Sequence, residues 1–172
     1  MVRKIRPNYY YNQIQNPKDP DEIKKLFDRA YTKSLNFLSF RARSEKEIRD
    51  YLLNKEFDIT IIEQVINLLL EQKFLNDREF AESWIEQRQN QKAKSKSFIR
   101  QELRQKGIDE EIISETLEKS HGDYNTARQY FEKRKKRFEN LTGEEYFQKA
   151  ASFLQRRGFS WDVVKKVLKD EY

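Results

Sequence analysis

Apolar positions recur along this chain with the spacing of amphipathic helices, and one such pattern is written three times. The three windows are "LLNKEFDITII", "LRQKGIDEEII" and "LQRRGFSWDVV", which begin at Leu52, Leu103 and Leu154. Each window opens with leucine, closes with an apolar pair and begins 51 residues after the one before it. Self-similarity at a fixed period of this size is typical of stacked supersecondary units, each too small to bury its hydrophobic face alone. The pattern therefore predicts a repeat protein.

The same register continues on both sides of the windows and within them. Matched apolar positions are Ile48, Ile99 and Ala150; Phe57, Ile108 and Phe159; and Ile66, Leu117 and Leu168. Identity between the copies is low, but apolar character is kept wherever a core needs it. We therefore predict that matched residues are buried at equivalent places in three similar units.

Each window predicts a helix, a sharp turn and a second helix. Gly107 and Gly158 follow basic residues, as expected for a left-handed residue just after the end of a helix. Asp109 and Ser160 then suit the N-cap of the next helix. The first window has Glu56 where the others have glycine, and a non-glycine residue in the left-handed region costs about 1 kcal/mol. We expect this first turn to be strained or differently shaped.

A further helix precedes each pair. In the middle unit, "FLNDREFAESWIEQRQ" predicts a helix with Asn76 as its N-cap and Glu79 as the capping-box partner. The corresponding helices run from about Asp21 to Arg41 in the first unit and from about Asp123 to Glu139 in the third. No stretch alternates as a strand does. The predicted class is all-α, with three tandem three-helix repeat units.

Capping boxes mark the starts of two of the middle helices. Ser44 with Glu47 opens the middle helix of the first unit, and Thr142 with Glu145 opens that of the third. These signals divide the chain into an N-terminal leader (1–20) and three-helix units over 21–72, 73–121 and 122–172. The tyrosines of the leader are compatible with a binding arm or with a loosely packed segment, and we favour the second interpretation.

Composition agrees with helical units and narrows the class further. The chain has 4 Gly and 3 Pro in 172 residues, and all three prolines lie in the first twenty positions. Hydrophobic and charged residues each make up 37%, which suits slender units with much surface, so we expect an elongated array. The sequence has no long apolar run, no signal-peptide pattern and no cysteine. We expect a cytoplasmic protein.

Catalytic chemistry has little support. The only histidine, His121, lies in the linker "EKSHGDY" without partners at metal-ligand spacing, and no glycine-rich phosphate loop is present. Asp109, Glu110 and Glu111 resemble an acid and base group, but their place in the first turn of a helix explains them through the helix dipole. We predict a protein that is not an enzyme and needs no metal or cofactor.

Charge gives the clearest functional signal. The formal net charge is +6, which is compatible with a polyanionic partner. The stretch "EKRKKRFE" holds five basic residues in a row, of which Lys133, Lys136 and Arg137 should point outward while Arg134 and Lys135 lie nearer the core edge. In "IRQELRQKG", Arg100 and Arg104 lie one helical turn apart. Such runs are compatible with a solvated face or with a binding surface, and both interpretations stay open here.

Three stretches resemble the successive signatures of the RecX family of recombination regulators. They are "RARSEKEIRDYLLNKEF", "FLNDREFAESWIEQRQ" and "IRQELRQKGI", and the resemblance covers roughly Leu35 to Leu117 with weaker likeness to the end. It implies a curved array of three three-helix units. It also implies binding to the RecA recombinase and its filament on single-stranded DNA, within the filament groove, with restraint of its ATPase, strand-exchange and coprotease activities.

Two positions depart from the family pattern. Ser95 stands where similar proteins commonly have glycine ahead of the second middle helix, and Glu56 replaces the glycine of the first turn. Both changes put the turn geometry in question rather than the cores. The residues expected to contact the partner or DNA are Arg100, Arg104, Lys133, Lys136, Arg137 and Arg156.

Three functional hypotheses follow. The first is a regulator of the RecA filament that acts as a monomer and contacts single-stranded DNA secondarily. The second is a stand-alone nucleic-acid binder, and the third is a generic helical scaffold. Direct reading of base sequence requires exposed Asn, Gln or Arg clustered in the N-terminal half of a helix, and the sequence shows no obvious seam for a dimer that reads two half-sites, so direct readout has weak support.

Overall fold

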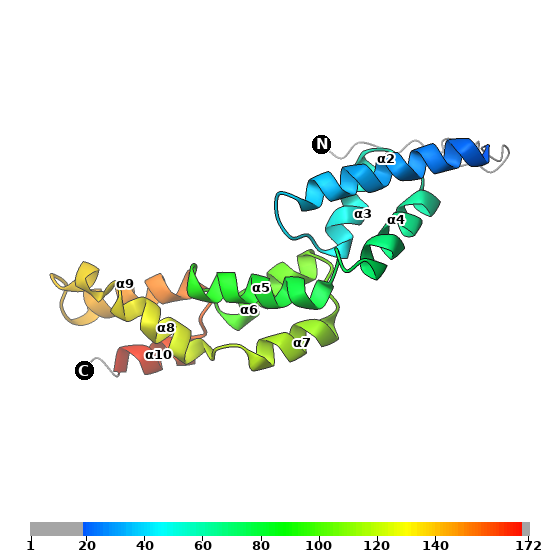
Figure 1. Ribbon diagram of the computed structural model, residues 1–172. Coiled ribbons are helices and arrows are strands. Elements are labelled where there is room, and N and C mark those ends of the chain that lie inside the picture. Colours follow the sequence, from blue (N-terminus) through cyan, green and yellow to red (C-terminus); the bar gives the residue numbers. More distant parts are fainter. Residues whose placement is uncertain (1–18, 170–172) are drawn as a thin grey trace, which may run out of the picture. The chain divides into compact units, whose positions relative to one another are not determined.

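The computed structural model describes residues 19–169, and within this range it contains nine α-helices, one short 3-10 helix and no strand. The elements are α2 (Pro20–Leu38), α3 (Glu45–Asn54), α4 (Ile59–Glu71), α5 (Asp77–Asn90), α6 (Lys96–Gln105), α7 (Glu110–Lys119), α8 (Asp123–Glu132), η1 (Lys135–Phe138), α9 (Gly143–Gln155) and α10 (Trp161–Lys169). They form three successive groups of three α-helices (Figure 1). The predicted all-α class and its three-helix repeat are confirmed.

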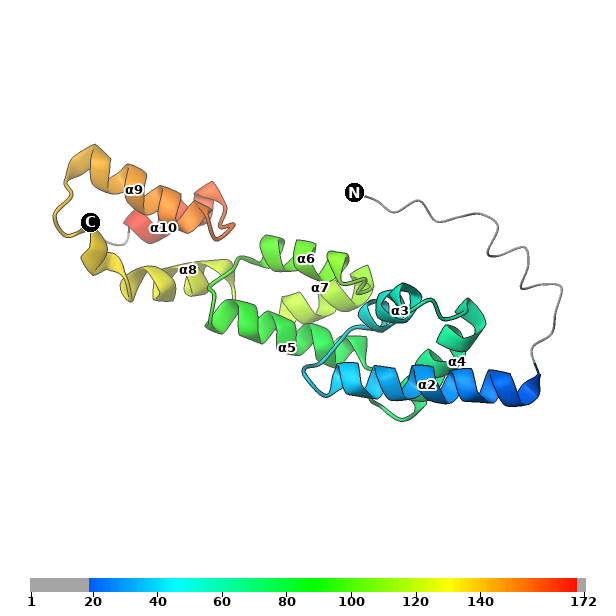
Figure 2. The same cartoon turned by 90° about the horizontal axis from the view of Figure 1, so that it is seen from above.

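The first and third helices of each group pack against each other. Helix α2 lies along α4, α5 along α7, and α8 along α10, as both views show (Figures 1 and 2). The contacts of the chain divide it into two compact units. Of the described residues, one unit holds 19–41 and Ile48–Phe74, and the other holds Ala42–Glu47 and 75–169. The predicted boundaries of the three repeat units stay a prediction, and nearly all of the proposed leader lies outside the described residues.

The matched apolar positions form the cores. Solvent reaches none of the surface of Leu52, Leu103 and Leu154, and the same holds for Ile48, Ile99 and Ala150. The later register positions Ile66, Leu117 and Leu168 are also buried, whereas Phe57 is half-buried beside its buried counterparts Ile108 and Phe159. The sequence period of 51 residues therefore corresponds to repeated burial at equivalent places in the three groups.

The turns between the second and third helices of the groups have one backbone geometry. Glu56, Gly107 and Gly158 have φ angles of 63°, 80° and 88°, all in the left-handed region. The turn at Glu56 is thus strained rather than differently shaped. Asp109 is the N-cap that the sequence predicts, since its side chain accepts a hydrogen bond from the amide of Glu111 at 2.8 Å.

Two other helix starts agree with the sequence and one does not. Ser44 and Glu47 form a reciprocal capping box, in which each side chain accepts a hydrogen bond from the backbone amide of the other residue. The Asn76 side chain accepts hydrogen bonds from the amides of Arg78 and Glu79.

The capping box predicted at Thr142 is wrong, because the Thr142 side chain caps no amide of α9. The residue that follows, Gly143, has a φ of 55°, so the chain enters α9 along a path that an ordinary capping box does not take.

The structure explains why serine fits at position 95, where similar proteins commonly have glycine. Ser95 is fully buried, has an extended backbone with φ of −68°, and caps α6 by accepting a hydrogen bond from the amide of Phe98. No glycine is needed at this position. The left-handed residue of this connection is instead Ala93, with a φ of 46°, and no sequence signal marks this position.

Helix α8 is shorter than predicted. The sequence predicts a helix to Glu139, but α8 ends at Glu132 and the chain continues as the 3-10 helix η1. Seven residues of α-helix would separate Phe131 and Phe138 by about 10.5 Å along the axis. The break brings their rings to a centroid distance of 5.8 Å, and both side chains are buried in one cluster. Aromatic packing thus accounts for the early end of the helix.

Inside the second compact unit, the residues that begin a middle helix form hydrogen bonds with the turn that follows the next middle helix. Two such helix starts are present among the described residues. The Ser44 hydroxyl donates to the carbonyl of Lys106 at 2.7 Å, and the amide of Glu45 donates to the carboxylate of Asp77 at 2.9 Å. At the matched positions, 51 residues later, the Ser95 amide donates to the carbonyl of Arg157 at 3.0 Å. The Lys96 amide likewise donates to the carboxylate of Asp123 at 2.8 Å; Asp123 begins α8 as Asp77 begins α5, although these two aspartates are 46 residues apart rather than 51. The repeat therefore includes its polar contacts as well as its apolar ones.

Candidate partner and nucleic-acid interface

Arg100 and Arg104 project from α6 and share one carboxylate. Both form ion pairs with Glu110, at the start of α7, and the Nε of Arg104 lies 2.7 Å from its carboxylate. The hydrogen bond from Arg104, followed by the charges of the two arginines, lowers the pKa of Glu110. Two of the six predicted interface residues thus meet on one surface, but an acid of the same chain neutralises part of their charge.

Lys133, Lys136 and Arg137 occupy the end of α8 and the helix η1, and all three are exposed as predicted. Arg134 is half-buried, also as predicted. Lys135 is not near the core edge: it is exposed and pairs with Glu132 at 2.9 Å. The helix break explains this error, because residues after Glu132 no longer follow the periodicity of α8.

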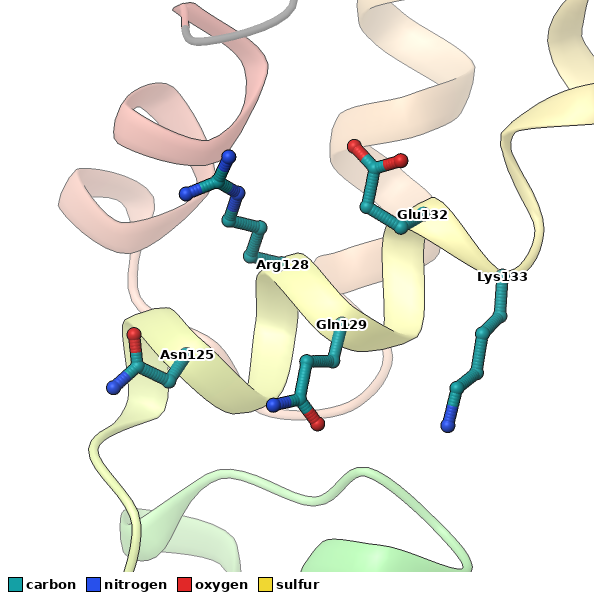
Figure 3. A pocket seen from close by; sticks show the side chains of 5 residues that line it. All are labelled: Asn125, Arg128, Gln129, Glu132 and Lys133. Atoms are coloured by element: carbon teal, nitrogen blue, oxygen red, sulfur yellow. The ribbon is translucent and has the colours of Figure 1, made fainter.

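An open hollow lies along α8 and is lined by Asn125, Arg128, Gln129, Glu132 and Lys133. Figure 3 shows Arg128 and Glu132 on one edge of the helix and Gln129 and Lys133 on the other. Within the described part of the chain, the side chains of Asn125, Arg128 and Gln129 form no hydrogen bond or ion pair. Only Lys133 of this set was predicted from the sequence. The signal that could have found the others is the spacing of Asn125, Arg128 and Gln129, which places exposed amide and basic side chains along α8.

The end of α9 carries two further arginines. Arg156 is exposed, as expected for an interface residue. Its neighbour Arg157, which the sequence did not single out, is half-buried and donates hydrogen bonds to the carbonyl of Lys92 at 2.9 Å and to the hydroxyl of Tyr130 at 2.6 Å. Arg157 matches Lys106 in the 51-residue register, and both residues precede a left-handed glycine. That match is the signal available in the sequence.

A second group of basic residues forms ion pairs and ring contacts within the protein. The guanidinium of Arg88 lies 3.9 Å from the centroid of the Trp84 ring and pairs with Glu102 at 2.6 Å. The indole nitrogen of Trp84 donates to the same carboxylate at 2.8 Å, and Lys106 pairs with Glu47 at 2.5 Å. These charges are neutralised locally, so they offer less to an external anion than the exposed residues of α8 and η1 do.

The residues examined as catalytic or metal-binding candidates in the sequence do not form a catalytic or metal site in the structure. Asp109 is an N-cap and Glu110 an ion-pair partner. His121 is exposed, and its backbone carbonyl accepts a hydrogen bond from Gln89. Over residues 19–169, no three His, Cys, Asp or Glu side chains are placed together as ligands for a metal ion. In the same range, no helix has the length and apolar character that crossing a bilayer requires.

The fold and its surface define an all-α repeat protein with a run of exposed basic side chains at the end of α8 and in η1. Three family models match the chain: the first three-helix domain of RecX at residues 30–69, the second at 76–117 and the third at 122–168. The chain therefore belongs to the RecX family. This is a family of regulatory proteins rather than enzymes, in agreement with the sequence prediction.

Relatives and solved structures agree with this assignment. The chain is 39% identical to the regulatory protein RecX of Bacillus velezensis and to that of Bacillus subtilis, over 86% of its own length. It spans 56% and 55% of those two relatives, so it matches little more than half of each. The crystal structure of RecX from Lactobacillus salivarius superposes with a TM-score of 0.75 at 26% identity, covering 86% of this chain and 97% of that one.

Proposed function

We propose that this protein binds the RecA recombinase and its filament on single-stranded DNA and restrains its ATPase, strand-exchange and coprotease activities. The observation that carries the proposal is membership of the RecX family, with all three three-helix domains matched in order. The relatives carry the name regulatory protein RecX, and the activity on RecA follows from the family resemblance of the sequence.

The proposal includes a surface and a setting. The protein acts in the cytoplasm as a monomer, through three-helix units at 21–72, 73–121 and 122–172. The residues proposed to face the recombinase or the coated strand are Arg100, Arg104, Lys133, Lys136, Arg137 and Arg156. Exposure of Lys133, Lys136, Arg137 and Arg156 supports this assignment, because charges at the rim of an interface steer association.

The alternative function is a stand-alone nucleic-acid-binding helical repeat protein. The face of α8 favours it, since Asn125, Arg128 and Gln129 are exposed along one helix, although only Asn125 lies in its N-terminal half. Side chains of these types form the hydrogen bonds that discriminate base edges. A protein of this kind would bind bare nucleic acid without the recombinase.

One experiment separates the two functions. Binding of the purified protein to bare single-stranded DNA is compared with its binding to RecA-coated DNA at one salt concentration, and ATP hydrolysis by the filament is measured in parallel. A filament regulator binds the coated strand more tightly and slows ATP hydrolysis as its ratio to recombinase rises. Tight binding to bare DNA, with hydrolysis unchanged at every ratio, contradicts the proposal and supports the alternative.

A further inference from the structure

Three arginines surround a stacked pair of aromatic rings in the second compact unit. We call Arg134, Arg137, Arg157, Tyr130 and Phe153 the arginine–aromatic cluster. The rings of Tyr130 and Phe153 stack with centroids 5.0 Å apart and an interplanar angle of 8°. The guanidinium carbons of Arg134 and Arg157 lie 4.4 and 4.8 Å from the centroid of Tyr130, and that of Arg137 lies 5.7 Å from the centroid of Phe153.

The cluster holds its arginines in place. Tyr130 is only 7% exposed, so its ring is fixed by the core, and its hydroxyl accepts a hydrogen bond from Arg157. A guanidinium that rests on a fixed ring loses less conformational entropy when it binds a ligand than a lysine ammonium on a flexible stem does. Arg137 is exposed and the other two arginines are half-buried, so all three have surface left for an external partner.

No acid of the described chain neutralises the cluster. Arg134, Arg137 and Arg157 form no ion pair with any carboxylate among residues 19–169, in contrast to Arg100 and Arg104 with Glu110. Lys94 adds a fourth charge, with its ammonium 3.6 Å from the centroid of the Phe98 ring. Burial, and then the nearby charge of Arg157, lowers the pKa of Lys94. The charge of Glu102 acts on Lys94 in the opposite direction, whereas no carboxylate among residues 19–169 pairs with the three arginines of the cluster.

We infer that the arginine–aromatic cluster is a docking surface for the phosphate backbone of single-stranded nucleic acid. A guanidinium binds phosphate oxygens in a bidentate way, and its open face accepts an unpaired base by stacking. The exposed Lys133 and Lys136, which flank Arg134 and Arg137 in the chain, extend the positive surface along which a backbone can run. The inference deepens the proposed function, since it names the part of the protein that touches the strand.

The test measures how binding to a bare oligothymidylate depends on salt. Each phosphate contact on a single strand contributes about 0.7 to the slope of log Kobs against log salt concentration. Arg134→Gln with Arg137→Gln should therefore flatten the slope by about 1.4 relative to the unmodified protein. The matched control is Arg49→Gln with Arg78→Gln, which removes the same charge from two arginines that already pair with Glu63 and Glu115. The control should leave the slope unchanged.

Two further measurements keep the result interpretable. Arg137→Gln alone changes one exposed side chain and should flatten the slope by about 0.7, even if the double variant is poorly folded. Equal slopes for the cluster variants and the control overturn the inference. A slope unchanged by the cluster variants, together with weaker binding to recombinase-coated DNA, would overturn it in favour of an acidic protein partner. ATPase inhibition by the unmodified protein is scored separately, so failure of the proposed function is distinguishable from failure of the inference.

Discussion

At the scale of single residues, the left-handed position of the three turns is glycine in two copies and glutamate in the third. What packs over each turn accounts for the difference. Glycine at 107 is required both by its φ of 80° and by its neighbour, because a Cβ there would lie 2.5 Å from the side chain of Lys46. A Cβ at Gly158 would lie 2.6 Å from the hydroxyl of Ser95. Glu56 has a similar φ, 63°, but is exposed. Glycine is thus kept where the turn is covered by a helix start.

This difference predicts the stabilities of two variants. Gly107→Val places a branched side chain in the left-handed region and against Lys46, so it should destabilise the protein by more than the roughly 1 kcal/mol of the backbone strain alone. Glu56→Gly relieves the same strain and should be neutral or stabilising. Thermal denaturation followed by circular dichroism measures both. A Gly107→Val protein that melts like the unmodified one would refute this account of the turns.

Asp123 gives a prediction about pH. Burial raises the pKa of this carboxyl, while the hydrogen bond from the Lys96 amide opposes the shift. A raised pKa in the folded state means that the folded protein holds this proton more tightly than the unfolded chain does. The contribution to stability is therefore fully present below the unfolded pKa and is lost as pH rises through the folded value.

Asp123→Asn removes that titration but keeps an oxygen to accept from Lys96. The free energy of unfolding of the unmodified protein, relative to Asp123→Asn, should rise as pH is lowered from neutral through the carboxyl range. Asp123→Ala leaves the Lys96 amide without its acceptor and should cost about 1 to 3 kcal/mol at neutral pH. Denaturant titrations of the three proteins at several pH values test this, and a pH-independent difference between Asp and Asn would contradict it.

At the scale of helices, the sequence predicted what burial periodicity determines and missed what packing between elements determines. The 51-residue register placed Leu52, Leu103 and Leu154 in equivalent cores, since apolar spacing directly reflects which face of a helix is buried. The end of α8 was wrong because the contact of Phe131 with Phe138 overrides a sequence that has no Gly or Pro to stop the helix. Local signals do not encode such a tertiary contact.

The register makes a quantitative prediction for Leu103. This side chain on α6 is fully buried in a cluster with residues of α5 and α7, so truncation leaves a cavity among three helices. Leu103→Ala should lower the free energy of unfolding by about 2 to 5 kcal/mol. The exposed Gln101 on the same helix provides the control, because Gln101→Ala should change stability by less than about 0.5 kcal/mol. Similar losses in the two variants would mean that the repeat does not define the core.

At the scale of the whole molecule, the candidate interface was only partly accessible from the sequence. The run of consecutive basic residues identified Lys133, Lys136 and Arg137 as exposed, because charged side chains are seldom buried without a partner, although the helix faces assumed for Lys136 and Arg137 do not exist beyond Glu132. The contact of Arg157 with the ring of Tyr130 could not be predicted, since it depends on the packing of α9 against another helix; only the register match of Arg157 with Lys106 was visible in the sequence. The ion pairs of Arg100 and Arg104 with Glu110 could not be predicted either, because they depend on how α6 packs against α7. These pairs reduce the positive charge that the two arginines present to a partner.

The charge pattern gives the last prediction, which concerns the proposed regulation of the recombinase filament. Lys133, Lys136 and Arg137 are exposed, so reversing all three to glutamate should leave the melting profile unchanged. Charges at the rim of an interface act mainly on the rate of encounter. The variant should therefore associate more slowly with the RecA filament and inhibit its ATPase less, and the defect should grow at low salt, where screening is weakest.

The control for this experiment is a second triple reversal, at Lys24, Lys25 and Arg29. These two lysines and one arginine are exposed on α2, and their reversal changes net charge by the same amount as the test set. If inhibition depends on net charge alone, both triple variants lose it equally and the assignment of the α8–η1 surface is wrong. Loss of inhibition in the test variant alone, with association rates that fall and dissociation rates that do not change, places the contact at Lys133, Lys136 and Arg137. That outcome follows from position rather than from charge, because the two variants differ only in where the charge lies.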